Sequence, residues 1–77
     1  MNAEQTLDCI GLYCPMPIVK TAEKIKGLKT GEVLEVVADD IGIKLDMSAW
    51  CKATGHELLG VEEAGKEIKV YVKKTHD

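Results

Sequence analysis

The chain has 77 residues, the length of one small domain, and we therefore treat residues 1–77 as a single domain. Hydrophobic residues make up 45% of the chain and charged residues 30%, a balance that excludes wholesale disorder. The formal net charge of −3 disfavours nucleic-acid binding, which usually needs a basic excess, and no apolar run approaches the roughly 18 residues that span a bilayer.

The first half of the chain predicts a strand, a helix and a second strand. Residues 6–9 alternate polar and apolar side chains, as a half-buried strand does. After a loop over residues 12–17, the apolar spacing becomes helical from residue 18 and ends at Gly27, which suits a helix stop. Residues 33–38 are almost entirely β-branched or apolar, which is typical of a central strand. The apolar face of the helix is expected to hold Ile18, Val19, Ala22 and Ile25.

A second helix follows, and the residues at its two ends indicate its limits. The pattern predicts a helix over residues 46–54, with Asp46 as the N-cap and Gly55 as the stop. Residues 41–44 fit this helix less well and are consistent with a separate turn. The two carboxylates at residues 39–40 end the preceding strand and are expected to cap the helix that follows.

The last third of the chain predicts two strands joined by a hairpin. Residues 57–62 and 68–73 form the strands, and residues 63–66 form the turn between them. The final strand alternates strictly, so one face of the sheet should be wet, with both helices packed on the other. The fold class is therefore a two-layer α/β sandwich of order β-α-β-α-β-β, with a four-stranded mixed sheet and two helices on one face. The polar tail that contains His76 is expected to be unstructured.

Cysteine usage indicates a reducing compartment and free thiols. The chain has three cysteines, an odd number, whereas a small secreted domain normally carries an even disulfide set. The N-terminus lacks the basic and apolar regions of a secretory signal, so we expect a cytoplasmic protein. Cys9 and Cys51 are expected to be small core residues, because free cysteine is among the residue types most often buried. A second interpretation of Cys9 is a resolving thiol that reacts with the sulfur of Cys14.

Residues 14–17, Cys-Pro-Met-Pro, form the one segment of the chain that points to chemistry. Pro15 and Pro17 fix their own φ angles and suit a first helical turn, where backbone N–H groups have no intrahelical partner. Cys14 is thereby placed at or near the N-cap of the first helix, at the positive end of the helix dipole. That position is expected to stabilise the thiolate and to lower the pKa of Cys14. The plainer alternative is a stiff helix start with Cys14 as a bystander.

Residues 7–17 resemble the signature of the TusA/SirA sulfur-carrier family. That signature is Leu-Asp, two residues, Gly-Leu, one residue and then Cys-Pro-x-Pro, and every fixed position matches here. Cys-Pro-x-Pro alone would be a weak signal, whereas further matches in order over nearly the whole chain make a strong one. Those further matches are Gly31-Glu32, Asp39-Asp40, Trp50 with Cys51, and residues 54–58.

The resemblance implies a β-α-β-α-β-β sandwich like the C-terminal domain of the third translation initiation factor. It also implies a sulfurtransferase that acts as a persulfide relay. In that relay Cys14 takes sulfane sulfur as a persulfide and hands it to a partner thiol, with Pro15 and Pro17 in support. The implied donor is a cysteine desulfurase or a rhodanese, the implied acceptor is a DsrE-like protein, and the carrier itself needs no cofactor or metal. Many members have a basic residue before the active cysteine, where this chain has Tyr13.

Three other functions fit parts of the sequence. A thiol-disulfide redox protein would pair Cys14 with Cys9 or Cys51. An RNA-binding module would follow from the likeness to an RNA-contacting domain, but the acidic balance and the lack of aromatic residues on a basic face argue against it. A metal site built from Cys14, Cys51 and His56 lacks the closely spaced ligand pairs that zinc sites normally show.

Overall fold

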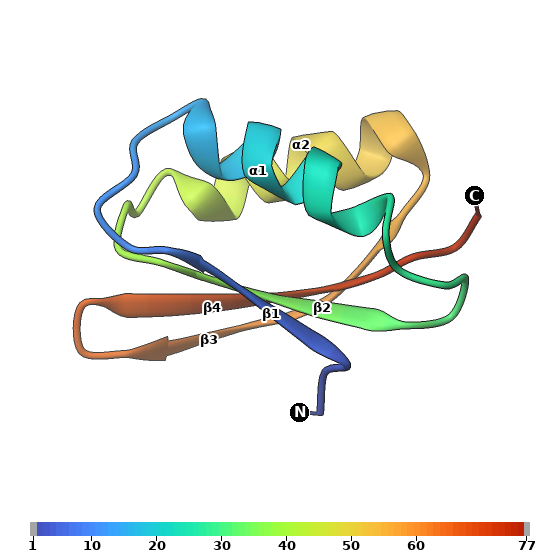
Figure 1. The fold of residues 1–77 in the computed structure, drawn as a ribbon. Coiled ribbons are helices and arrows are strands. Elements are labelled where there is room, and N and C mark those ends of the chain that lie inside the picture. The colour runs from blue at the N-terminus through green and yellow to red at the C-terminus, as the bar shows by residue number, and fades with distance from the viewer. Residues whose placement is uncertain (1, 77) are drawn as a thin grey trace.

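The computed structural model describes residues 2–76 and confirms the expected order of elements (Figure 1). Strands and helices alternate along the chain, which then ends in two consecutive strands. Both helices begin two or three residues earlier than expected, and the third strand runs two residues further. The elements are β1 (Gln5–Cys9), α1 (Met16–Ile25), β2 (Val33–Ala38), α2 (Ile43–Thr54), β3 (Glu57–Ala64) and β4 (Glu67–Lys73).

The four strands form one mixed sheet in the order β1-β2-β4-β3. β1 runs parallel to β2, and the other two pairs are antiparallel. Both helices lie on the same face of the sheet, so the molecule has the two layers expected from the sequence (Figure 1). The register pairs Cys9 of β1 with Ala38 of β2, and the two strands therefore end at the same edge of the sheet. That edge holds the loops that lead into α1 and α2.

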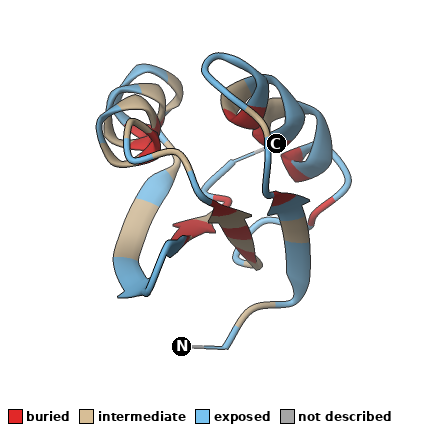
Figure 2. Ribbon diagram, turned by 90° about the vertical axis from the view of Figure 1, so that its left-hand side faces the viewer, coloured by how far each residue is buried: buried red, intermediate tan, exposed pale blue. Residues whose placement is uncertain are grey.

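The core lies between the sheet and the helices and is built mostly from aliphatic side chains. Successive residues of a strand point to opposite faces, so every second residue of the central strands faces the helices. Burial in β2 follows this rule, with Leu34, Val36 and Ala38 buried (Figure 2). Side chains from β4 and from the inward faces of the helices complete the core: Ile68, Val70, Val72, Ile25, Ile43, Met47 and Cys51.

α1 buries Ile25 as expected, but its other buried side chains are not the expected ones. Its buried residues are Pro17, Thr21 and Ile25, which lie four positions apart and form one stripe. Ile18 is only half-buried and Val19 is exposed. Thr21 is accommodated in the core because its hydroxyl donates a hydrogen bond of 2.7 Å to the Pro17 carbonyl. A stripe that contains a proline and a threonine does not stand out in the apolar spacing of the sequence.

α2 begins at Ile43, and Asp46 lies inside its first turn instead of capping it, so the expected N-cap was wrong. Gly42 is the N-cap, and Asp40 in the preceding loop accepts hydrogen bonds from the start of the helix. Its side chain accepts the Gly42 N–H at 3.0 Å, and its carbonyl accepts the Ile43 N–H at 3.0 Å. Gly55 ends the helix as expected, with a left-handed φ of 85° that favours glycine.

The open face of the sheet is not uniformly wet, because Tyr71 is buried there with only 2% of its surface exposed. Its hydroxyl donates a hydrogen bond of 2.7 Å to Glu35, and a Glu62 oxygen lies 3.1 Å from the same hydroxyl. The hydrogen bond to Glu35 is the main cause that raises the pKa of Tyr71, since loss of the proton would place a third negative charge between two carboxylates. One face of β4 therefore packs on the helices, and the other anchors a polar cluster.

The C-terminal tail is ordered over the described residues, which contradicts the expectation for His76. Its Nε2 lies 2.6 Å from the Thr54 carbonyl oxygen, and its ring stacks on His56 with centroids 4.4 Å apart. Lys74 is buried, and its ammonium donates a hydrogen bond of 2.7 Å to the Leu28 carbonyl just beyond α1. A cation is favourable there because the dipole of a helix is negative at its C-terminus.

Met47 and Leu45 of α2 provide a matched test of the core. Met47→Ala is expected to lower the free energy of unfolding by about 2–5 kcal/mol, because it leaves a cavity where the side chain is fully buried. Leu45→Ala is expected to change it by less than about 0.5 kcal/mol, because 79% of Leu45 is exposed. Urea unfolding followed by circular dichroism measures both values. Equal losses would contradict the assigned inward face of α2.

Candidate functional site

Cys14 lies in the loop between β1 and α1, and its side chain is exposed. Pro15 is the N-cap of α1, so the cysteine stands one residue before the cap, near its expected position. The Cys14–Pro15 peptide bond is cis. Met16 N–H donates to the Tyr13 carbonyl at 2.8 Å, and Pro17 is buried in the first turn of the helix. The motif thus anchors one proline in the core and leaves the cysteine at the surface.

Aspartate side chains tie this loop to the loop that leads into α2. One oxygen of Asp40 accepts the Cys14 N–H at 3.4 Å, and the other accepts the Gly42 N–H at 3.0 Å. Asp39 accepts the Gly11 N–H at 3.0 Å in the same way. These hydrogen bonds hold the cysteine loop beside the start of α2.

The sequence pattern predicts a capping role for residues 39–40 but not their contact with the cysteine loop. A signal for the contact was present. A β-α-β unit places two parallel strands in one sheet, and their carboxyl ends lie at the same edge. The cysteine loop follows β1 and the aspartate pair follows β2, so the two segments leave neighbouring strands at one end of the molecule (Figure 1).

The carboxylates near Cys14 raise the pKa of its thiol, and the lowered pKa expected from the helix dipole is therefore wrong. The main cause is the Asp46 carboxylate, which accepts a hydrogen bond from the protonated thiol. Desolvation and the negative charges of Asp46 and Asp40 act in the same direction. Both carboxylates come from α2 and the loop before it, so the motif at residues 14–17 carried no sign of them.

Cys9 and Cys51 are buried, as expected for small core residues. Burial is the main cause that raises the pKa of each thiol. All three cysteines are free. A disulfide from Cys14 to either of the others would have to join an exposed sulfur to one inside the core, and this weighs against the redox alternative.

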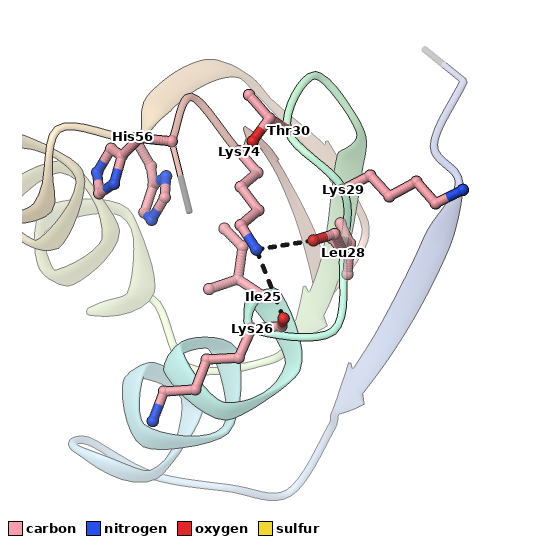
Figure 3. A pocket seen from close by; sticks show the side chains of 8 residues that line it. Ile25, Lys26, Leu28, Lys29, Thr30, His56 and Lys74 are labelled. Atoms are coloured by element: carbon pink, nitrogen blue, oxygen red, sulfur yellow. Dashed lines mark hydrogen bonds between the residues drawn. The ribbon is translucent and has the colours of Figure 1, made fainter.

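A pocket of about 550 Å³ lies at the C-terminal end of α1, away from Cys14 (Figure 3). Its walls come from the end of that helix, the loop that follows, His56 and the C-terminal tail. The Lys74 ammonium is held there by the carbonyls of Leu28 and Lys26, at 2.7 and 3.5 Å (Figure 3). The described residues that line the pocket include no cysteine. The exposed thiol therefore belongs to the open surface and not to this cleft.

His56 takes part in ring stacking. Its ring packs between those of Trp50 and His76, with centroids 5.5 and 4.4 Å away. Over residues 2–76, no cluster of three or more His, Cys, Asp or Glu side chains is placed to hold a metal ion. In the same part of the chain, neither helix has the length and apolar character needed to cross a membrane.

Comparison with known families decides the relationship suggested by the motif. Residues 5–74 match the model of the family described as Sulfurtransferase TusA. The chain belongs to this family. The matched stretch includes the cysteine loop and reaches from the start of β1 past the end of β4, so it covers the whole sandwich.

Curated relatives extend this result. YrkF of Bacillus subtilis is 51% identical over 96% of this chain, which spans 40% of YrkF. YrkI of the same organism is 43% identical over 96% of this chain and 99% of its own length. Both are named for a candidate role as sulfur carriers. The sulfur carrier protein TusA of Allochromatium vinosum is 38% identical over 94% of this chain and 95% of its own length. All three names refer to sulfur carriers.

A solved structure shares the fold of this TusA-family chain. The SirA-like protein from Desulfitobacterium hafniense superposes with a TM-score of 0.80, over 94% of this chain and 99% of that one. The two sequences are 20% identical, so the structural similarity is evidence for the fold alone. It confirms the two-layer sandwich with a mixed sheet.

The titration of Cys14 tests the effect of the neighbouring carboxylates. The rate of iodoacetamide alkylation plotted against pH should have a midpoint above the ordinary value for a cysteine thiol. Asp46→Asn should lower that midpoint, because loss of the negative charge makes the thiolate easier to form. Glu57→Gln removes a charge at the opposite end of the sheet and should leave the midpoint unchanged. A wild-type midpoint below the ordinary value would show that the helix dipole dominates.

Proposed function

We propose that this chain is a sulfur carrier whose Cys14 accepts sulfane sulfur as a persulfide and passes it to the thiol of a partner protein. The observation that carries the proposal is the contrast among the three cysteines, because Cys14 is exposed while Cys9 and Cys51 are buried. A transferred sulfur must be reached by a second protein, which requires an accessible thiol. Family membership over residues 5–74 supports the same role.

The proposed transfer exchanges one S–S bond for another. The Cys14 sulfur attacks the outer sulfur of the donor persulfide, and a bond forms between them while the donor's own S–S bond breaks. The donor cysteine leaves as a thiolate and takes up the proton that Cys14 loses. In delivery, the partner thiol attacks the outer sulfur, and Cys14 is the leaving thiolate. The exchange involves no net gain or loss of electrons, so the carrier uses no redox cofactor.

The two prolines have separate supporting roles in this proposal. Pro15 is exposed at the N-cap of α1, and Pro17 is buried in the first turn of the same helix. The backbone that follows Cys14 is therefore fixed by the pyrrolidine ring of Pro15 at the surface and by the packing of Pro17 in the core. A fixed loop has less conformational entropy to lose when a partner docks, and this favours rapid transfer.

The partners in this proposal are proteins. The donor is a cysteine desulfurase or a rhodanese, and the acceptor is a DsrE-like protein, as the family resemblance implies. The chemistry that creates sulfane sulfur belongs to the donor, so this chain acts as a stoichiometric sulfurtransferase with one sulfur on Cys14 in each cycle. We place the relay in the cytoplasm, where thiols stay reduced.

Intact mass after incubation with a sulfane-sulfur donor tests the role of Cys14. The wild-type protein should gain about 32 Da, the mass of one sulfur atom, as a persulfide. Cys14→Ser should gain nothing, because the two remaining thiols are buried. Cys9→Ser and Cys51→Ser are the matched controls and should still gain the sulfur.

The same measurement separates the carrier from a dithiol redox protein. Under mild oxidation, a disulfide between Cys14 and Cys9 or Cys51 would lower the mass by two hydrogen atoms, whereas a persulfide raises it. Sulfur uptake that survives Cys14→Ser and disappears in Cys9→Ser would move the carrier site to the buried strand and reject the proposal.

Pro15→Ala tests whether the rigid start of α1 matters for transfer. The fold should remain intact, because Pro15 is exposed, whereas a change of Pro17 would also disturb the core. One freed backbone residue costs about 1–2 kcal/mol, so single-turnover transfer from the loaded protein to an acceptor thiol should slow by about tenfold. Circular dichroism is the folding control. Wild-type transfer by a folded variant would mean that the proline only starts the helix.

A further inference from the structure

Exposed apolar side chains gather at the end of the molecule that holds Cys14. Seven large hydrophobic residues of the described chain are exposed, and six of them lie in the two loops and first helical turns next to this cysteine. Four belong to the β1–α1 loop and the start of α1, and two belong to the loop into α2 and its first turn. These six residues are 41% to 79% exposed and form what we call the apolar collar: Ile10, Tyr13, Met16, Val19, Ile41 and Leu45.

The two parts of the apolar collar come from distant segments but share one end of the molecule. The hydrogen bonds of Asp39 and Asp40 to Gly11 and Cys14 join the two loops. The loops into α1 and α2 accordingly lie side by side (Figure 1). Single exposed apolar residues are ordinary on a protein surface, whereas several at one place mark a contact surface.

The charges that act on the Cys14 thiol within the apolar collar are negative. Asp40 and Asp46 act on the Cys14 thiol from the side of α2, and both are partly exposed. Lys44 lies in the same helical turn, but its ammonium is already paired with Glu63 at 2.8 Å. A surface that is apolar and negative around a reactive sulfur is complementary to a partner surface that is apolar and positive.

On the basis of the proposed function, we propose that the apolar collar docks a sulfur-transfer protein whose contact face is apolar and carries a lysine or arginine beside its reactive cysteine. On docking, that cation pairs with Asp46 and Asp40 and offsets their charge at the Cys14 sulfur. The thiolate then forms when the partner's sulfur is within reach. Away from the partner, the protonated thiol reacts slowly with oxidants, because the thiolate is the reactive form.

Other occupants fit the apolar collar less well. A second copy of the chain would bring Asp40 and Asp46 against the same two carboxylates, and like charges at short range repel. An anionic lipid surface meets the same repulsion. A small molecule would need a cavity at the Cys14 sulfur. The pocket of about 550 Å³ lies at the far end of α1, and a second pocket of about 270 Å³ touches the apolar collar only through Ile41 and is not lined by Cys14.

Short cysteine peptides test this partner chemistry directly. Each peptide carries its cysteine as a mixed disulfide with 5-thio-2-nitrobenzoate and has two leucines beside it. Two further residues are varied together, so that one peptide has two arginines, one has two glutamines and one has two glutamates. The Cys14 thiolate attacks the peptide sulfur, forms a disulfide with the peptide and releases the coloured thiolate, whose absorbance gives the rate. Cys14→Ser measures the background from the buried thiols.

The charge of the peptide should decide its rate. The arginine peptide is expected to react about fivefold faster than the glutamate peptide at low salt, with the glutamine peptide between them, and salt at about 1 M should weaken the difference. Asp46→Asn should move the ratio of the two rates toward one. This ratio of two peptide rates does not depend on the fraction of Cys14 that is thiolate in the free protein, because both peptides react with the same thiol. Asp40→Asn is a second variant with the same expected effect.

Matched controls separate the apolar collar from the rest of the surface. Glu57→Gln removes one negative charge at the opposite end of the sheet and should keep the wild-type ratio. Tyr13→Ser and Leu45→Ser should each slow the leucine-flanked peptide about threefold relative to a serine-flanked one, because apolar contact is lost. Val61→Ser removes an exposed apolar side chain outside the apolar collar and should change neither rate.

Several outcomes would overturn the inference. The first is a ratio of the arginine-peptide rate to the glutamate-peptide rate near one in the wild type. The second is a ratio that Asp46→Asn leaves unchanged, and the third is a ratio that Glu57→Gln lowers as much as Asp46→Asn does. A dimer seen by light scattering that Leu45→Ser dissociates would assign the apolar collar to a second copy of the chain. The exchange assay needs no persulfide, so a failed sulfur-loading experiment rejects the proposed function alone, and a failed peptide ratio rejects the docking inference alone.

Discussion

The parallel pairing of β1 with β2 is the constraint on which the functional end of this molecule depends. Cys9 and Ala38 are partners at the last position of the two strands, so both strands end at one edge of the sheet. The segments that continue from them are the cysteine loop and the aspartate pair. They meet because the strands do, and Asp40 then accepts the N–H of Cys14 from the neighbouring loop. A shift of this register would move Asp40 away from Cys14.

Two opposing electrostatic effects act on the Cys14 sulfur. The dipole of α1 favours a thiolate near its N-terminus, with the strength of about half an elementary charge. Asp46 and Asp40 carry full charges, Asp46 also accepts a hydrogen bond from the thiol, and these contributions prevail. The three thiols are thus protected in different ways. Cys9 and Cys51 are enclosed by the core, whereas the carboxylates beside Cys14 raise the pKa of its exposed thiol.

The signature motif at residues 14–17 contributes one residue to the core and leaves others at the surface. Pro17 belongs to the buried stripe of α1, whereas Pro15 caps the same helix in the open. The helix start that presents the cysteine is therefore anchored by hydrophobic packing beneath it. This unit matches nearly the whole of YrkI and less than half of YrkF, so the same sandwich occurs by itself and within a longer relative.

The order of strands and helices was predictable from the sequence, because hydrophobic periodicity depends on residues that are close together in the chain. The alternation at residues 68–73 indicated which face of β4 meets the helices, and the motif located the exposed cysteine and the family. The tertiary structure alone decided the surroundings of that cysteine. The sign of the pKa shift of Cys14 depends on Asp46, which a different helix supplies, and the backbone N–H of Cys14 donates to Asp40 of the neighbouring loop. Such contacts have no periodic signature, because the packing of whole elements brings the residues together.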